Sequence, residues 1–172
     1  MEKISNAILT VEIAEHGAEF QSIRKNDKEY LWQGDAKFWG RRSPVLFPNV
    51  GRVWNDEYRY MGKTYQIGQH GFARDMDFSV TSKSDDCIEY CLESTPETLA
   101  KYPFPFRMKI GYALNGNKIT VKWHVENIGD TDMYFQIGAH PAFYFPNFDP
   151  TTQERCFFAF DNSKDLKYIS PV

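Results

Sequence analysis

The sequence predicts an all-β protein, a mainly antiparallel sandwich or large twisted sheet, and three observations support this prediction. Apolar and polar residues alternate with the two-residue period of strands, whereas a helical period is almost absent. Short apolar runs separated by turn residues recur along the chain. Two long alternating runs flank Asn115-Gly116, a frequent hairpin turn. The length of 172 residues fits a single domain, 1–172, with a sizeable core.

The first strand is predicted at Ala7–Ile13, where apolar residues occupy every second position. Further short strands are expected at Phe20–Arg24, Glu29–Trp32, Val45–Phe47, Tyr58–Tyr60, Thr64–Ile67, Asp77–Ser82 and Cys87–Leu92. One short helical turn is expected after Thr95, because Thr95 can cap it and Pro96 suits the first helical position. Pro103 would end it.

The clearest predicted element is a hairpin formed by the alternating runs Phe106–Leu114 and Ile119–Val125. A two-residue turn at Asn115-Gly116 would pair Tyr112 with Ile119. In that register all apolar side chains of the two strands share one face, which predicts a hairpin with one buried side.

Two later strands are expected, at Met133–Ile137 and around Arg155–Asp161. The sequence ends at Ile169–Val172 without the pattern of a closing strand, so the sandwich is expected to be incomplete at its C-terminus. Open sheet edges invite pairing with another chain. Self-association of the chain through such edges is therefore an expectation.

The composition excludes several classes of protein. Lys and Arg number 20 against 23 Asp and Glu, so the net charge of −3 gives no electrostatic reason to bind nucleic acid or an anionic membrane. No apolar run approaches the ~20 residues of a membrane helix, and Met1–Asn6 lacks the pattern of a signal peptide. Cys87 and Cys91 lie ~13 Å apart in one predicted strand, and Cys156 is expected in the core, so reduced thiols in the cytoplasm are expected.

Two of the four histidines lie in segments that are typical of functional loops. His16 and His124 are expected at the surface, the first in a turn and the second on the polar face of the hairpin. His70 and His140 instead lie in Gln69-His70-Gly71-Phe72-Ala73-Arg74 and Gly138-Ala139-His140-Pro141-Ala142-Phe143, which are rich in glycine, proline and aromatics. Loops on a rigid β scaffold often carry binding sites. The alternative is that both imidazoles only cap backbone carbonyls.

Two arginines could bind a ligand. Arg52 and Arg74 can each present a planar fork of donors to hydroxyls or to a phosphate. The alternative is ion pairing at the surface, for example of Arg74 with Asp75 or Asp77. No set of His, Cys or carboxylate residues has the spacing of a metal site, and no phosphate-binding glycine loop or nucleophile elbow is present.

Taken together, these segments resemble the aldose 1-epimerase (galactose mutarotase) family, in the bacterial branch that carries His-Gly-Phe-Ala-Arg, here His70–Arg74. The resemblance runs from the first strand through Pro-Val-Leu-Phe-Pro and Gly51-Arg52 to Gly138–Phe143, and covers nearly the whole chain. It implies a galactose mutarotase-like supersandwich whose concave sheet holds a hexose. The implied activity is interconversion of the α and β anomers of free sugars, without metal or cofactor.

The resemblance also implies roles for individual residues. His140 would be the general acid that protonates the ring oxygen, and His70 would hydrogen-bond the sugar. Arg52 would contact sugar hydroxyls, and Arg74 matches an arginine that helps to bind phosphate in related hexose-6-phosphate mutarotases. Phe72 and Phe143, together with Trp54 and Tyr144, could stack on the sugar, although core packing is the more ordinary role of an aromatic ring.

The sequence departs from the family near its end. Members are longer, and their general base is a C-terminal glutamate preceded by a sugar-binding aspartate; neither has a counterpart here. Asp149, Glu154 and Asp161 are not assigned to that role. The favoured hypothesis is therefore an incomplete epimerase that carries the acid side of the site. The alternatives are a non-catalytic carbohydrate-binding sandwich, a hexose-6-phosphate mutarotase, and a partial domain that pairs with a second copy.

Overall fold

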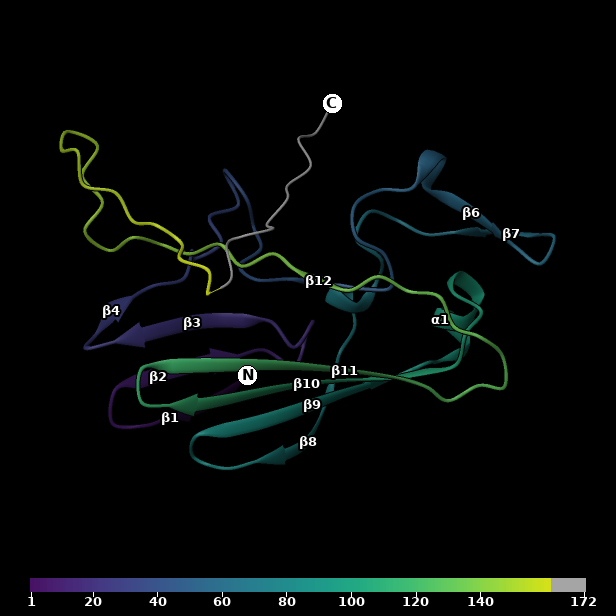
Figure 1. Cartoon of the computed structure of the whole chain (residues 1–172), viewed down its shortest axis with the longest axis horizontal. Helices are drawn as coiled ribbons and strands as arrows, with labels where there is room; N and C mark the ends of the chain where they lie inside the picture. Colours follow the sequence, from purple (N-terminus) through teal and green to yellow (C-terminus); the bar gives the residue numbers. More distant parts are fainter. Residues whose placement is uncertain (162–172) are drawn as a thin grey trace.

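The computed structural model describes residues 1–161 and confirms the predicted all-β antiparallel fold (Figure 1). One four-stranded sheet has the order β1-β2-β3-β4, and a second has the order β11-β10-β9-β8. The strands of the first are β1 (Glu2–Ser5), β2 (Leu9–Ile13), β3 (Phe20–Lys25) and β4 (Lys28–Glu29). Those of the second are β8 (Ser79–Lys83), β9 (Cys87–Glu93), β10 (Phe106–Asn115) and β11 (Lys118–Asn127).

Shorter elements connect and flank these sheets. Two more antiparallel pairs are β5 (Val45–Leu46) with β12 (Gly138–Ala139) and β6 (Glu57–Tyr60) with β7 (Lys63–Gln66). The helical elements are η1 (Trp54–Asp56), η2 (Ala73–Asp75) and α1 (Pro96–Lys101). In Figure 1, α1 and the β6–β7 hairpin lie at one end of the molecule, and the stretch after β12 lies toward the other.

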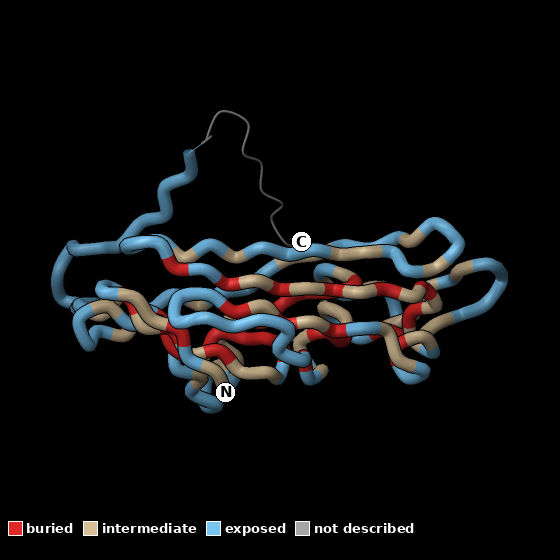
Figure 2. The backbone as a smooth tube through the Cα atoms, turned by 90° about the horizontal axis from the view of Figure 1, so that it is seen from below, coloured by how far each residue is buried: buried red, intermediate tan, exposed pale blue. Residues whose placement is uncertain are grey.

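The core lies between the two four-stranded sheets, whose buried residues form one contiguous cluster. The ring centroids of Phe20 on β3 and Tyr112 on β10 are 4.5 Å apart. The Tyr112 hydroxyl donates to the carbonyl of Ala18 at 2.6 Å, which satisfies the polar end of an otherwise apolar side chain. Figure 2 shows the buried residues concentrated in the middle of the molecule, and the residues after β12 mostly exposed.

The predicted helical turn is confirmed as α1, and its cap explains where it begins. Thr95 accepts a hydrogen bond from the amide of Thr98 at 3.3 Å, and the Thr98 hydroxyl oxygen accepts one from the amide of Thr95 at 2.8 Å. This reciprocal capping box and Pro96 in the first turn fix the start of the helix.

The predicted hairpin forms, but two details of the prediction are wrong: the turn lies one residue later in the sequence, and the strand register is shifted by two residues. The central residues of the turn are Gly116 and Asn117, and Tyr112 pairs with Val121 rather than with Ile119. Gly116 has a φ of +57° at the first central position, where type II′ turns favour glycine. A shift of two residues leaves every side chain on its predicted face, so the apolar face is confirmed.

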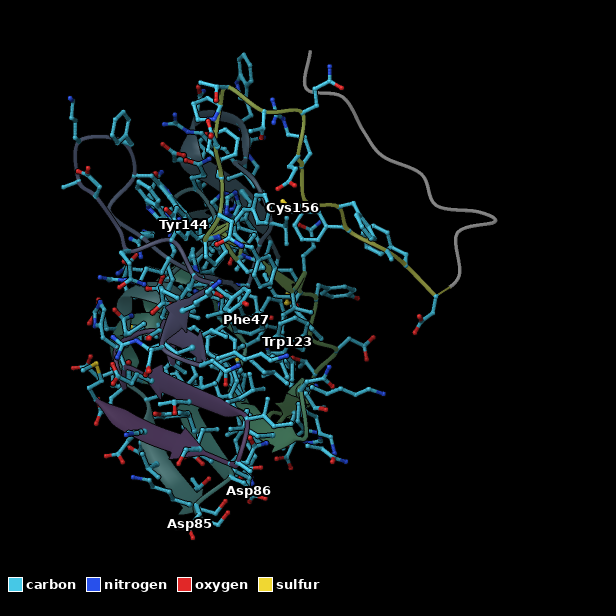
Figure 3. All side chains as sticks on the ribbon, turned by 90° about the vertical axis from the view of Figure 1, so that its left-hand side faces the viewer. Phe47, Asp85, Asp86, Trp123, Tyr144 and Cys156 are labelled. Carbon is cyan, nitrogen blue, oxygen red and sulfur yellow. The ribbon has the colours of Figure 1, made fainter. Side chains whose placement is uncertain are left out.

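Other strand predictions fail in particular places. The sequence missed β1, and Met133–Ile137 and Arg155–Asp161 form no strand although both segments are described. Cys156, expected in the core, is exposed, and Figure 3 shows it outside the two sheets. Ile169–Val172 lie outside the described residues.

The apolar face of β11 is incompletely covered. On the neighbouring β10 the side chains of this face are buried, whereas Ile119, Val121 and Val125 on β11 are only half-buried. Trp123 is 41% exposed. Within residues 1–161, no strand pairs with the outer edge of β11.

Candidate functional site

The loop that carries His70 is bonded to the residue that follows β5. The carbonyl of Phe47 accepts hydrogen bonds from the amides of Phe72 (3.0 Å) and Ala73 (3.2 Å), and the amide of Phe47 donates to the carbonyl of His70 (3.2 Å). Gly71 makes this approach possible, because a Cβ there would lie 2.1 Å from the Phe47 oxygen. Its φ of +71° also favours glycine. The glycine of the motif therefore has a local structural cause.

The imidazole of His70 is held in one tautomer by the backbone of Gly51. The Gly51 amide donates to Nδ1 of His70 at 3.0 Å, and the His70 amide donates to the Gly51 carbonyl at 2.8 Å. Because a backbone amide can only donate, Nδ1 is the acceptor and the neutral ring carries its hydrogen on Nε2. Burial lowers the pKa of His70, and the nearby charges of Arg74, His140 and Arg41 lower it further. His70 is thus a neutral hydrogen-bond donor through Nε2.

His140 lies beside His70 at the end of β12. Because β12 pairs with β5, the amide of His140 donates to the carbonyl of Pro44 at 3.1 Å. The ring of His140 is exposed, and its centroid lies 6.4 Å from that of His70 and 5.0 Å from that of Trp39. Two loops 70 residues apart in sequence therefore place their imidazoles side by side. Among residues 1–161 neither ring donates to a backbone carbonyl; the ring of His70 instead accepts a hydrogen bond from a backbone amide.

The two arginines have different surroundings. Arg52 is exposed and binds the Asp56 carboxylate through Nε (2.7 Å) and Nη2. Arg74 is mostly buried: Nη2 donates to the carbonyl of Gln69 at 2.8 Å, and Nε lies 3.6 Å from an Asp75 oxygen. Asp75 also accepts a hydrogen bond from Arg41 at 2.6 Å. The predicted Arg74–Asp75 ion pair is therefore present, and Arg74 and Arg41 make the surroundings of His70 positive.

The predicted aromatic contacts are divided between core and surface. Phe72 is 7% exposed and packs against Phe47 and Phe106, so the structure places its ring in the core and not beside the two histidines. Phe143 is 55% exposed and packs against Phe158. Trp54 and Tyr144 are also exposed. His16 and His124, expected at the surface, are exposed as predicted.

Sequence reasoning missed three groups that shape the site. These are Trp39, which contacts His140; the amide of Gly51, which bonds His70; and Glu19, a carboxylate only 7% exposed. Glu19 accepts hydrogen bonds from the amides of Arg42 (2.7 Å) and Ser43 (2.6 Å), and so fixes the chain just before Pro44. The signal for Trp39 lay in the segment Phe38-Trp39-Gly40-Arg41-Arg42, which combines aromatics, glycine and charge.

Other features of the described residues lie apart from this pair. A cavity of about 430 Å³ is lined by aromatic side chains of β6, of the residues after α1 and of the stretch before β12, among them Tyr60, Phe104 and Tyr134, and not by the histidines. No group of three or more His, Cys, Asp or Glu in residues 1–161 is arranged to hold a metal ion. No helix among them is long and apolar enough to cross a membrane.

Comparison with known proteins decides what kind of scaffold holds the two histidines. A sequence profile described as aldose 1-epimerase matches residues 3–171. The chain belongs to the aldose 1-epimerase family. The resemblance of its motifs to that family is thereby confirmed, and so is the galactose mutarotase-like fold.

Members of the aldose 1-epimerase family and their structural relatives extend beyond this chain. The chromosomal protein LacX of Lactococcus lactis is 33% identical over 151 residues, which cover 84% of this chain and 50% of LacX. A galactose mutarotase related enzyme from Lactobacillus acidophilus is 42% identical with a TM-score of 0.85, over 89% of this chain and 52% of that one. A galactose mutarotase-like protein from Lactobacillus casei is also 42% identical, with a TM-score of 0.81 over 83% and 49% of the two chains. The chain thus spans about half the length of the relatives it matches.

Proposed function

We propose that this chain carries the acid side of a mutarotase site, which interconverts the α and β anomers of a hexose. His140 is the general acid toward the ring oxygen, and His70 donates a hydrogen bond from Nε2 to the same region of the sugar. The separation of 6.4 Å between the two imidazole centroids supports this assignment most directly. Membership of the aldose 1-epimerase family supports the reaction class.

The two histidines suit two different tasks in this reaction. Ring opening moves a proton from the anomeric hydroxyl to a base and another from an acid to the ring oxygen, while the bond between C1 and that oxygen breaks and C1 becomes a carbonyl. Rotation about the C1–C2 bond and the reverse transfers then close the ring on the other face. His140, exposed and without a hydrogen bond to its ring among the described residues, can approach the ring oxygen. His70, held neutral by its surroundings, can stabilise that oxygen without exchanging a proton.

The general base is not assigned within this chain. Asp149, Glu154 and Asp161 are exposed, and no contact places them beside His70 or His140. The proposal leaves the base outside the described residues; the relatives that the chain matches are about twice as long.

A phosphorylated hexose is the second candidate substrate. Nε of Arg74 is buried and has no hydrogen-bond partner among the described residues, and Arg41 lies near the same Asp75 carboxylate. Two guanidinium groups beside His70 favour an anionic substituent on the sugar. Rates measured in parallel with a free hexose and with its 6-phosphate distinguish the two substrates.

The test is the rate of anomer exchange, measured by NMR exchange spectroscopy on an equilibrated hexose. The expected result is exchange faster than in buffer alone, with water accepting the proton of the anomeric hydroxyl in place of the missing base, a loss of about 10²-fold or more in His140→Ala, and no change in the control His124→Ala, whose ring is exposed on β11. Undiminished exchange in His140→Ala would exclude the acid role. Sugar-dependent shifts of the His70 resonances without any exchange would instead support the non-catalytic carbohydrate-binding alternative.

We also propose that two copies of this chain associate through β11. Its outer edge is unpaired within residues 1–161, and the row that contains Trp123 is incompletely covered. Sedimentation of the 172-residue chain should show a dimer that Trp123→Lys dissociates. A monomeric wild type would reject this association.

A further inference from the structure

We propose that Trp39 is a positioning residue for His140: its indole holds the imidazole in the orientation in which it faces His70. This inference rests on the proposed function, since it concerns the acid of that reaction. Trp39 belongs to none of the three motifs that the sequence singles out.

The argument begins with the weak anchoring of the His140 side chain. Its backbone is fixed, because its amide donates to Pro44 and the amide of Ala142 donates to the carbonyl of Arg42 at 2.8 Å. Its ring is exposed and makes no hydrogen bond within the described residues, whereas the ring of His70 is bonded to Gly51. An exposed imidazole without a polar partner rotates about its side-chain bonds unless packing restrains it.

Packing by Trp39 supplies that restraint. The two ring centroids are 5.0 Å apart with an angle of 51° between the ring planes, and the indole is half-buried. Among the described residues, the aromatic rings beside the His140 imidazole are those of Trp39 and His70. A flat and rigid indole at this distance favours imidazole orientations that keep the contact.

Trp39 is itself fixed to the segment that it contacts. Its carbonyl accepts a hydrogen bond from Nε1 of Trp32 at 2.8 Å, and its amide donates to the carbonyl of Asp35 at 2.9 Å. The amide of Trp32 donates to the carbonyl of Ala142 at 2.8 Å. Trp32 therefore joins the Trp39 loop to the segment that follows β12 and carries His140, so the indole and the imidazole keep their relative position.

The experiment compares Trp39→Ala, Trp39→Phe and the control Phe38→Ala in the 172-residue chain. Phe38 lies on the same loop, but its ring contacts Trp32 at 6.3 Å between centroids. Without sugar, NMR should show that Trp39→Ala changes the shifts and the cross-relaxation contacts of the His140 ring protons, because the ring current of the indole is lost. Phe38→Ala should leave both unchanged. Unaltered His140 signals in Trp39→Ala would overturn the proposal.

The second readout separates positioning from direct sugar binding. Anomer exchange measured over a range of hexose concentrations should show kcat reduced about tenfold in Trp39→Ala with little change in KM, and largely restored in Trp39→Phe. A raised KM with kcat retained would mean that Trp39 stacks on the sugar, which contradicts the proposal. If the wild-type chain shows no exchange, the proposed function fails, and the sugar-free NMR comparison alone decides whether Trp39 orients His140.

Discussion

Replacement of Gly71 by alanine should destabilise the protein much more than the same replacement at Gly62. Both glycines have left-handed backbones, with φ of +71° and +76°. Alanine in that region costs about 1–2 kcal/mol at either position. At Gly62 a Cβ would meet nothing within 4 Å, whereas at Gly71 it would lie 2.1 Å from the Phe47 oxygen and 2.6 Å from the Pro48 nitrogen. Ordinary contacts begin near 3.4 Å, so backbone must move at Gly71.

Forced overpacking of this kind costs about 1–3 kcal/mol more. The total expected loss is therefore about 2–5 kcal/mol for Gly71→Ala and about 1–2 kcal/mol for Gly62→Ala. The free energies of unfolding are measured by urea denaturation, followed by circular dichroism and tryptophan fluorescence. Losses that agree within about 0.5 kcal/mol would refute the argument that close approach, rather than φ, requires glycine beside His70.

Three further predictions concern stability. Thr95→Ala removes the cap of α1 and should lower the free energy of unfolding by about 1 kcal/mol, with Thr95→Ser close to wild type; equal losses in both would contradict the capping role. Glu19→Ala leaves the amides of Arg42 and Ser43 without their acceptor and should cost at least about 2 kcal/mol, against a smaller loss in Glu19→Gln, as denaturant titration would show. Because the pKa of His70 is lowered in the folded protein, the unfolded state binds more protons, and the free energy of unfolding should fall as the pH decreases from about 6.5 toward the folded-state pKa. The denaturation midpoint plotted against pH over this range should have a shallower slope in His70→Gln than in the wild type. An unchanged slope would exclude His70 as the cause.

The sequence predicted the elements whose pattern is local. Alternation located the strands of both large sheets except β1, and Thr95 with Pro96 located α1, because each pattern depends on residues a few positions apart. The hairpin register was missed because Asn115-Gly116 and Gly116-Asn117 both suit a two-residue turn, and local preference alone does not decide between them.

Features that depend on distant partners could not be predicted. Met133–Ile137 alternates like a strand, yet pairs with no strand; only Gly138 and Ala139 find a partner in β5. Cys156 lies among phenylalanines in sequence, but none of the described elements covers that stretch. The motifs identified His70 and His140, whereas Trp39 and the Gly51 amide become visible only when the chain brings them to those rings.

Phe47 couples the local opening of the His70 loop to the opening of the core. Its ring is fully buried against Phe106 and Tyr102, while its carbonyl holds the amides of Phe72 and Ala73. These two amides should therefore exchange with deuterium only in openings that also separate the sheets, although they belong to a loop. Slow exchange of these two amides would show that the His70 loop belongs to the rigid scaffold and has its binding conformation before sugar binds.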